Sequence, residues 1–354
     1  MNTSRTSIPI AVALSGGVDS AVAAALLQQQ GHRLVGITMN LLPDAVATSA
    51  AEQVAEHLGI PLHRIDLTDA FEQQVITPFV TCYLNGETPN PCVRCNRLVK
   101  FGLLLEQAQR LGADRLATGH YARVLRDADG RAHLHAAFDR RKDQSYFLAA
   151  IGQAALQQTL FPLGDMSGKD QVRQLARDFG LPVAAAKDSQ DVCFLPDSGY
   201  AEFLEKRLTT PPVQGLIVHR SGQLLGRHNG FWRYTVGQRK GLGIAWSEPL
   251  YVLEINAARN RVVVGEQQYL YAPGLSADQA VWFGQEPGTP FEAHCKIRYR
   301  HAPVPCLVEP QGEGEMRVRF HEPQRAVTPG QTVVIYQGDE VLGAGRITGA
   351  ELPC

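Results

Sequence analysis

The chain has 354 residues, of which 44% are hydrophobic and 19% charged, and its formal net charge is −1. This composition excludes a disordered chain, and the length exceeds what one hydrophobic core serves, so we expect two or three domains. The near-zero charge excludes nucleic-acid binding by overall attraction, so any RNA contact must come from a local basic face.

Strand and helix signals alternate through the first half at the spacing typical of a parallel sheet with helices on both faces. Ligands of such sheets bind beyond the carboxyl ends of the strands. A glycine follows each predicted helix, where positive φ commonly ends one. In chain order we predict strands at Ile8–Leu14, Leu34–Met39, Leu62–Ile65 and Arg115–Thr118, and helices at Asp19–Gln30, 49–58, Asn96–Leu111 and Lys169–Phe179.

The pattern changes near residue 208, where apolar–polar alternation replaces helical periodicity and indicates mainly antiparallel β structure. A soft break near Pro273-Gly274 divides this half. We therefore predict an α/β domain over residues 1–204, a small mainly β domain over 208–270 and a second β domain over 275–354. The predicted strands are Gly215–Val218, Leu250–Ile255, Arg261–Val264, Glu292–Tyr299, Met316–Phe320, Thr332–Tyr336 and Glu340–Ile347.

Cysteine usage and the absence of long apolar runs indicate the cellular compartment in which the protein works. The seven cysteines are dispersed, unlike those of a small disulfide scaffold. No stretch approaches the ~18 apolar residues of a membrane span, and Ile8–Leu14 is too short and wrongly flanked for a signal peptide. We expect a cytoplasmic protein with no membrane partner, in which a Cys-x-x-Cys pair serves catalysis or metal binding.

The first predicted strand runs into Ser15-Gly16-Gly17-Val18-Asp19-Ser20 at the start of a helix. Glycines let the backbone approach a ligand, and the free N–H groups and dipole of a helix start attract anions. Two glycines alone would favour a plain tight turn, but six residues in this order after a buried strand favour an anion site. The lysine-bearing NTPase loop is absent, because the nearest match, Gly164 to Lys169, has the wrong spacing.

This loop, together with further short sequence blocks along the chain, resembles the tRNA-specific 2-thiouridylases, a family of PP-loop ATP pyrophosphatases. Ser-Gly-Gly-x-Asp-Ser is the signature of the PP-loop, and the other blocks follow in the family's order from residue 11 to about 347. They are Thr88-Pro89-Asn90-Pro91 with Cys95-Asn96 and Lys100-Phe101, Ala117-Thr118-Gly119-His120-Tyr121, Lys142-Asp143-Gln144-Ser145-Tyr146-Phe147-Leu148, Cys193-Phe194, the run Thr235–Gly243, and Val327-Thr328-Pro329-Gly330-Gln331.

The resemblance implies a Rossmann-like PP-loop domain, a small β domain that contacts tRNA, and a C-terminal β-barrel. It implies ATP-dependent 2-thiolation of uridine 34, in which AMP transfer to the C2 oxygen precedes attack by sulfur, with Mg²⁺ on the phosphates. The nucleotide-binding positions carried over are Ala13, Leu14, Ser15, Gly16, Gly17, Val18, Asp19, Ser20, Met39 and Gly119. Those carried over for tRNA are Asn90, Pro91, His120, Lys142, Asp143, Gln144, Arg298, Tyr299 and Gln331.

The sulfur chemistry rests on three cysteines. In the family's usual form, the cysteine matching Cys193 carries a persulfide, and the one matching Cys95 releases its sulfur by forming a disulfide with it. Cys92 stands where the family usually has an aspartate. Three thiolates can also hold a [4Fe–4S] cluster with one open iron. We favour this cluster over the persulfide route, and a small buried Cys92 with no role comes third.

Two basic strips with aromatic residues fit contact with RNA phosphates and bases. One includes Trp232, Arg233 and Arg239, and the other runs from Lys296 to His301. A solvated β surface would look the same from charge alone. The family implies tRNAs of the Lys, Glu and Gln type, and as sulfur donor a cysteine desulfurase, a sulfur relay protein or free sulfide.

Two other functions compete with this hypothesis. One is a different PP-loop enzyme, either another tRNA thiolase or an ATP-pyrophosphatase-type synthetase. The other is a non-catalytic RNA-binding iron–sulfur protein, against which the intact Ser15-to-Ser20 loop argues.

Overall fold

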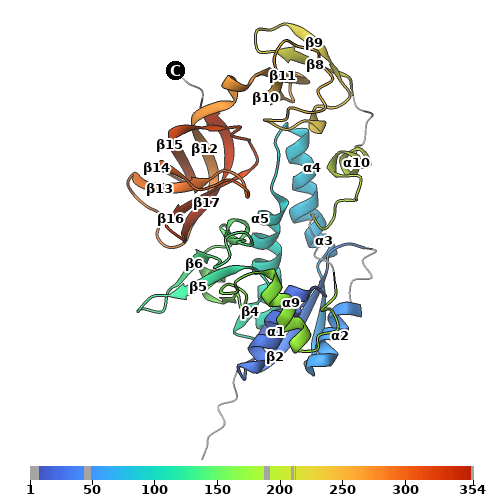
Figure 1. Ribbon diagram of the computed structural model, residues 1–354, viewed down its shortest axis with the longest axis vertical. Coiled ribbons are helices and arrows are strands. Elements are labelled where there is room, and N and C mark those ends of the chain that lie inside the picture. Colours follow the sequence, from blue (N-terminus) through green and yellow to red (C-terminus); the bar gives the residue numbers. More distant parts are fainter. Residues whose placement is uncertain (1–7, 44–48, 187–191, 209–210, 212, 352–354) are drawn as a thin grey trace, which may run out of the picture.

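The computed structural model describes residues 8–43, 49–186, 192–208, 211 and 213–351. An α/β lobe carries the N-terminal half, a small β unit lies at the opposite end, and a β-barrel lies beside the helices that connect the two (Figure 1). No helix within the described ranges is long and apolar enough to cross a membrane.

The lobe is built on a parallel sheet in the strand order β3-β2-β1-β4-β7. Ala11 and Val12 of the first strand point to opposite faces and are both fully buried, because helices cover both sides. The strand order reverses between β1 and β4, which opens a crevice at their carboxyl ends. The strands are β1 (Ile10–Ala13), β2 (Leu34–Asn40), β3 (Leu62–Asp66), β4 (Arg115–Ala117) and β7 (Thr159–Leu160).

The predicted helices of the lobe are confirmed with one change. The helix predicted over Asn96–Leu111 begins earlier, at Pro91, and its middle is π-helical. A π-helical stretch inside an α-helix is often found at functional sites. The helices are α1 (Val18–Gln29), α2 (Ser49–Leu58), α3 (Thr68–Phe71), η1 (Glu72–Ile76), α4 (Thr77–Leu84), α5 (Pro91–Cys95), η2 (Asn96–Leu104), α6 (Leu105–Arg110), α7 (Ser145–Leu148), α8 (Gln153–Gln157), α9 (Lys169–Asp178) and α10 (Tyr200–Glu205).

A hairpin that the sequence did not predict joins the lobe to the barrel. Strands β5 (Ala122–Arg126) and β6 (Ala132–Ala136) pair with each other, and β6 continues the barrel sheet through β17. The buried side chains of Leu116, Leu134 and Val334 belong to one hydrophobic core that runs from the lobe into the barrel. The lobe and the barrel therefore share part of their interior.

The small unit is a sheet in the order β10-β11-β8-β9, in which β11 and β8 are parallel and the other neighbours are antiparallel. Trp232, which we expected on an RNA-facing surface, is buried in a hydrophobic cluster with Phe79 of α4 and Phe203 of α10. The elements are β8 (Gly215–His219), β9 (Leu224–His228), η3 (Phe231–Arg233), β10 (Leu250–Asn256), β11 (Arg261–Glu266) and η4 (Gln267–Leu270).

The barrel follows the strand order β12-β15-β14-β13-β16-β17 and closes because β12 also pairs with β17. Pro273 and Gly274 lie inside β12, at a register shift in its pairing with β15. The sequence did not predict β12 or β14. The strands are β12 (Tyr271–Trp282), β13 (Phe291–Lys296), β14 (Val304–Gly312), β15 (Glu315–Arg325), β16 (Thr332–Gln337) and β17 (Glu340–Glu351).

Candidate active site

The loop between β1 and α1 has the geometry of an anion cradle. Gly16 has a φ of +77°, and a Cβ built there would lie 2.9 Å from the Cβ of Ala50. The Ser20 hydroxyl donates to the Gly17 carbonyl at 3.0 Å and accepts from the Ser15 N–H at 3.2 Å. The first-turn N–H groups of a helix have no intrahelical acceptor, so those of α1 are oriented for an anion.

Gly119, a predicted nucleotide-binding residue, packs directly on this loop. A Cβ at this position would lie 2.7 Å from the Asp19 carbonyl carbon and 2.7 Å from the Ser20 nitrogen. The structure therefore brings the loop after β4 against the start of α1, at the crevice between β1 and β4. Met39, another residue predicted to bind the nucleotide, lies near the carboxyl end of β2.

Asp19 has two partners that the sequence did not predict. Lys169, the first residue of α9, places its Nζ 2.8 Å from both carboxylate oxygens of Asp19. The Tyr121 hydroxyl donates to Oδ1 of the same carboxylate at 2.7 Å. Lys169 is the lysine of the Gly164-to-Lys169 segment, whose spacing did not fit a phosphate loop. The fold thus supplies from α9 the cation that the loop itself lacks.

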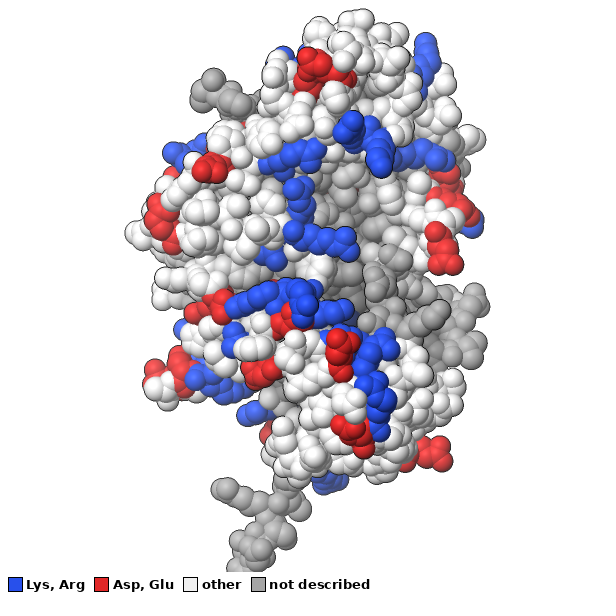
Figure 2. All heavy atoms as spheres, in the orientation of Figure 1, with Lys and Arg blue, Asp and Glu red and all other residues white. Residues whose placement is uncertain are grey.

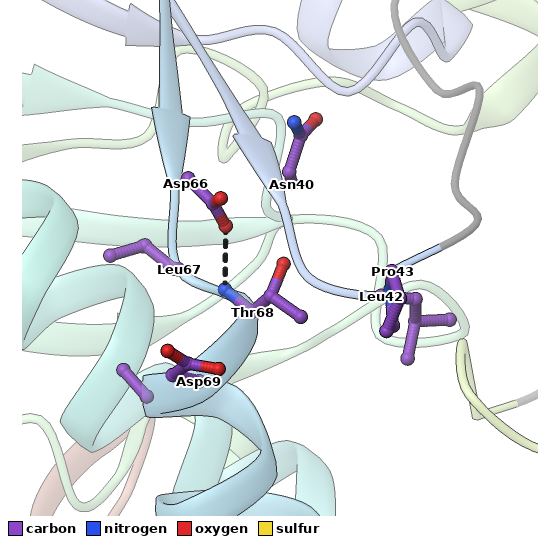
Figure 3. A pocket seen from close by; sticks show the side chains of 8 residues that line it. Asn40, Leu42, Pro43, Asp66, Leu67, Thr68 and Asp69 are labelled. Carbon is purple, nitrogen blue, oxygen red and sulfur yellow. Dashed lines mark hydrogen bonds between the residues drawn. The ribbon is translucent and has the colours of Figure 1, made fainter.

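A cavity of about 670 Å³ lies at the carboxyl ends of β2 and β3. In Figure 3, Asp66 accepts a hydrogen bond from the Thr68 N–H at 3.0 Å, and Asn40, next to Met39, lies on the other strand. The Oδ1 atom of Asn40 is buried and has no hydrogen-bond donor within the described part of the chain. The lining residues are Asn40, Leu42, Pro43, Asp66, Leu67, Thr68, Asp69 and Ala70.

Helix α5 positions two of the three predicted thiols. Asn90 is its N-cap, and the Oδ1 atom of Asn90 accepts a hydrogen bond from the Val93 N–H at 3.3 Å. Pro91 follows at the first helical position, which suits its fixed φ. Cys92 is half-buried and Cys95 is buried, whereas Cys193 is exposed on the segment before α10.

The three thiols lie within electrostatic range of one another. Desolvation of the sulfur is the main cause that raises the pKa of each thiol, even of Cys193, which is exposed as a residue, and for Cys95 the pKa reaches about 11. The charge on the Cys193 sulfur also raises the pKa of Cys92 and of Cys95. The structure thus brings together cysteines that are about a hundred residues apart in the chain.

Lys100 is the cation that all three thiols share. Its ammonium lowers the pKa of Cys92, Cys95 and Cys193 against the effect of burial. It also lowers the pKa of His120, after the larger effect of desolvation. Because His120 follows Gly119, which packs on Asp19, the thiol cluster and the phosphate loop belong to one continuous site. The sequence marked Lys100 only as part of a family block.

The structure does not support the expected [4Fe–4S] cluster. Among the residues that the structure describes, no group of three or more His, Cys, Asp or Glu side chains is arranged to hold a metal ion. Cys193 is exposed while Cys95 is buried. Our preference for the cluster over the persulfide route is therefore not supported.

Several predicted tRNA-binding residues hold the protein's own backbone. The Asp143 carboxylate is buried and accepts from the N–H of Ala137 at 2.9 Å and from the N–H of Ser145 at 3.1 Å. The Gln144 side chain accepts from the Tyr121 N–H at 2.9 Å. These bonds fix the loop on which Lys142 is partly exposed.

His120 is held by a hydroxyl and by two aromatic rings. Its Nδ1 lies 2.7 Å from the Thr118 hydroxyl, and its ring packs on those of Phe101 and Phe161. Desolvation holds the pKa of His120 well below its usual value, so the ring is neutral at physiological pH.

The remaining predicted tRNA residues lie on the barrel side. Arg298 and Tyr299 follow β13, and the Tyr299 ring lies 4.4 Å from that of Phe147. The Gln331 amide donates to the Thr88 carbonyl at 2.8 Å. Lys and Arg side chains gather along the hollow between the barrel and the lobe (Figure 2). Desolvation is the main cause that lowers the pKa values of Arg298 and Lys296, and the like charges of Arg325 and Arg140, respectively, add to it.

The fold and the site define a nucleotide-binding α/β enzyme domain joined to a β-barrel. Family models match along the chain: a tRNA methyl transferase HUP domain over residues 8–197, a PRC-barrel domain over 201–266 and an aminomethyltransferase β-barrel domain over 273–347. Two relatives named tRNA-specific 2-thiouridylase MnmA are more than half identical to this chain over 96% of its length, so the chain belongs to the family of tRNA-specific 2-thiouridylases.

Two relatives cover almost the entire chain. The tRNA-specific 2-thiouridylase MnmA of Pelobacter propionicus is 58% identical over 346 residues, which are 96% of this chain and 98% of the relative. That of Trichlorobacter lovleyi is 56% identical over 348 residues, with the same shares. Among solved structures, a 4-thiouridine synthetase–RNA complex with bound ATP matches at a TM-score of 0.37 and 18% identity, covering 56% of this chain and 50% of that one.

Proposed function

We propose that this chain uses ATP to replace the C2 oxygen of uridine 34 in tRNA with sulfur. The observation that carries the proposal is the continuity of the site: Lys100 acts on all three thiols and on His120, and the adjacent Gly119 packs on the phosphate loop. Such a site can activate an oxygen with a nucleotide and deliver sulfur to the same carbon.

The residues at the crevice fit an adenine nucleotide. The glycine cradle, the N-terminus of α1 and Lys169 suit phosphates, and a ligand donor would satisfy the orphaned Oδ1 of Asn40. Mg²⁺ on the phosphates would neutralise charge that develops on the leaving pyrophosphate, and Asp19 is the loop carboxylate that would hold it. Transfer of AMP to the C2 oxygen converts a poor leaving group into a good one.

The sulfur step is assigned to Cys193 and Cys95. The terminal sulfur of a Cys193 persulfide attacks C2, and AMP leaves with the former C2 oxygen. The Cys95 thiolate then attacks the Cys193 sulfur, so that the C2–sulfur bond remains, the S–S bond of the persulfide breaks and a Cys95–Cys193 disulfide forms. An external dithiol must reduce this disulfide before the next turnover. Exposure of Cys193 suits its reloading by a sulfur donor.

The test uses purified chain, a tRNA transcript with uridine 34, Mg·ATP, a persulfide donor and a dithiol. We expect AMP and 2-thiouridine in equal amounts from the wild type, and AMP without 2-thiouridine from Cys193→Ser. Absence of AMP in the presence of tRNA would favour a non-catalytic RNA binder. Retained thiolation by Cys193→Ser would remove Cys193 from the mechanism.

A further inference from the structure

The turn before β16 of the barrel binds residues 87–89, which lead into α5, the helix that carries Cys92 and Cys95. The Thr88 N–H donates to the Pro329 carbonyl at 2.8 Å. The Gln331 side-chain amide donates to the Thr88 carbonyl at 2.8 Å and to the Pro89 carbonyl at 3.4 Å. Both backbone polar groups of Thr88, its N–H and its carbonyl, are thus held by the barrel, two residues before Asn90 caps α5.

Close packing reinforces these hydrogen bonds. Gly330 has a φ of +89°, and a Cβ built on it would lie 3.0 Å from the Cβ of Glu87 and from the backbone of Thr88. Arg346 of β17 donates to the Glu87 carboxylate at 2.9 Å while it also binds Asp278. The barrel therefore contacts this segment through backbone, side chain and charge.

A second connection fixes the same helix from its other side. The Tyr146 hydroxyl of α7 donates to the Thr332 carbonyl at 2.8 Å, and it also interacts with the Asn90 side chain. The buried Asn96 amide donates to the Phe147 carbonyl at 2.9 Å. Because Cys92 and Cys95 lie between Asn90 and Asn96, both ends of their helix are tied to the barrel or to a residue that the barrel binds.

We propose that Gln331 is a positioning residue for the sulfur site, through which the barrel sets the place of Cys92 and Cys95. The inference rests on the proposed function, and it gives Gln331 a role other than the tRNA contact that the family resemblance implies. Attack of one sulfur on another depends on alignment, and displacement of a reacting group by about 1 Å can cost about a hundredfold in rate.

The test compares Gln331→Ala, Gln331→Glu and Gly330→Ala with the wild type. Gln331→Glu replaces the amide donor with a carboxylate acceptor that faces two carbonyls. Gly330→Ala places a Cβ 3.0 Å from the backbone of Thr88, so that the backbone must shift. The matched control is Gln311→Ala, because the Gln311 amide also donates to a barrel carbonyl, that of Glu309, but on an exposed strand end. The measurements are the single-turnover rate at saturating tRNA, the KM for tRNA, and hydrogen exchange of the peptide covering residues 87–96.

We expect each of the three variants to slow single turnover by about tenfold or more, with KM for tRNA changed less than about twofold and faster exchange in residues 87–96. The control should match the wild type. A raised KM with unchanged turnover and unchanged exchange would overturn the proposal in favour of direct RNA contact. The exchange measurement needs no activity, so faster exchange in a chain whose wild type does not thiolate would refute the proposed function and leave the barrel–helix linkage standing.

Discussion

The Lys169 ammonium lies 2.8 Å from both carboxylate oxygens of Asp19, although 150 residues separate them in the chain. The Lys169 side chain is only 12% exposed, so solvent screens this ion pair less than one on the surface. When a nucleotide occupies the loop, the same ammonium can neutralise phosphate charge. The pair therefore links a helix from the second half of the lobe to the loop of the first βα unit.

Replacing Lys169 should impair ATP use more than folding. We predict that Lys169→Met lowers kcat/KM for ATP by about a hundredfold, because a fixed cation at the phosphates is lost, and that Lys169→Arg restores part of it. Steady-state AMP release in the presence of tRNA measures the effect. Lys206→Met is the control, since Lys206 forms an exposed i,i+4 pair with Glu202. Unchanged kcat/KM in Lys169→Met would place the phosphates elsewhere.

A methyl group at Gly119 should close the nucleotide site. The Cβ of Gly119→Ala would meet the backbone of Asp19 and Ser20 at 2.7 Å, so the loop must shift. We predict loss of binding of a non-hydrolysable ATP analogue by calorimetry, with the melting temperature little changed. Gly226→Ala, for which no heavy atom lies within 4 Å of the new Cβ, should bind as the wild type does. Normal binding by Gly119→Ala would contradict the assigned site.

Lys100 should control the reactivity of the thiols. Its charge opposes the burial that raises their pKa values, so Lys100→Met should raise all three pKa values and reduce the thiolate fraction at neutral pH. We predict slower iodoacetamide alkylation of Cys92, Cys95 and Cys193 at pH 7 to 9, followed by peptide mass spectrometry, with rescue by Lys100→Arg. Arg97→Met on the same helix is the control and should be alkylated at the wild-type rates. Alkylation of Lys100→Met at the wild-type rates would refute the role of Lys100 in lowering the thiol pKa values.

His133 should make the stability of the contact between the β5–β6 hairpin and the barrel depend on pH. Its Nδ1 lies 2.6 Å from Glu340 of β17 and its Nε2 lies 3.1 Å from Asp127, and hydrogen bonds to these carboxylates, first Glu340 and then Asp127, raise its pKa. Since the folded pKa lies above the unfolded value of about 6.5, this stabilisation is complete below about pH 6.5 and is lost as the pH rises through the folded pKa.

The corresponding measurement is the melting temperature of the wild type and of His133→Gln between pH 5.5 and 9. We predict that the variant melts at most a few degrees lower at the acid end and that the gap narrows toward pH 9. Neighbouring Arg123, Asp339 and His135 are retained in both proteins, so their titration largely cancels. A difference in melting temperature that widens with rising pH would contradict the raised pKa of His133.

Local signals in the sequence were sufficient for the strand–loop–helix units of the lobe. Gly31, Gly59 and Gly180 all adopt positive φ where the predicted helices end, because each helix end needs that conformation. The π-helical stretch after Cys95 and the hairpin that enters the barrel sheet were not predicted. Both depend on contacts with distant segments, which single-sequence periodicity does not report.

The candidate site divides in the same way. The loop from Ser15 to Ser20 and the three cysteines could be predicted, since each carries its chemistry in a short motif. Lys169, Tyr121 and Lys100 could not be assigned, because their roles come from the fold rather than from neighbouring residues. Asp143 and Gln144 lie in a block predicted to contact tRNA, and the structure adds that their side chains bind the protein's own backbone.

The most direct test of the account is a single turnover of persulfide-loaded enzyme without added dithiol. With tRNA and Mg·ATP, the account predicts one 2-thiouridine per loaded chain, one AMP, and a Cys95–Cys193 disulfide that appears at the same rate by peptide mass spectrometry. Thiolation that proceeds with both thiols still free, or that continues through several turnovers in the absence of a reductant, would contradict the transfer of sulfur from Cys193.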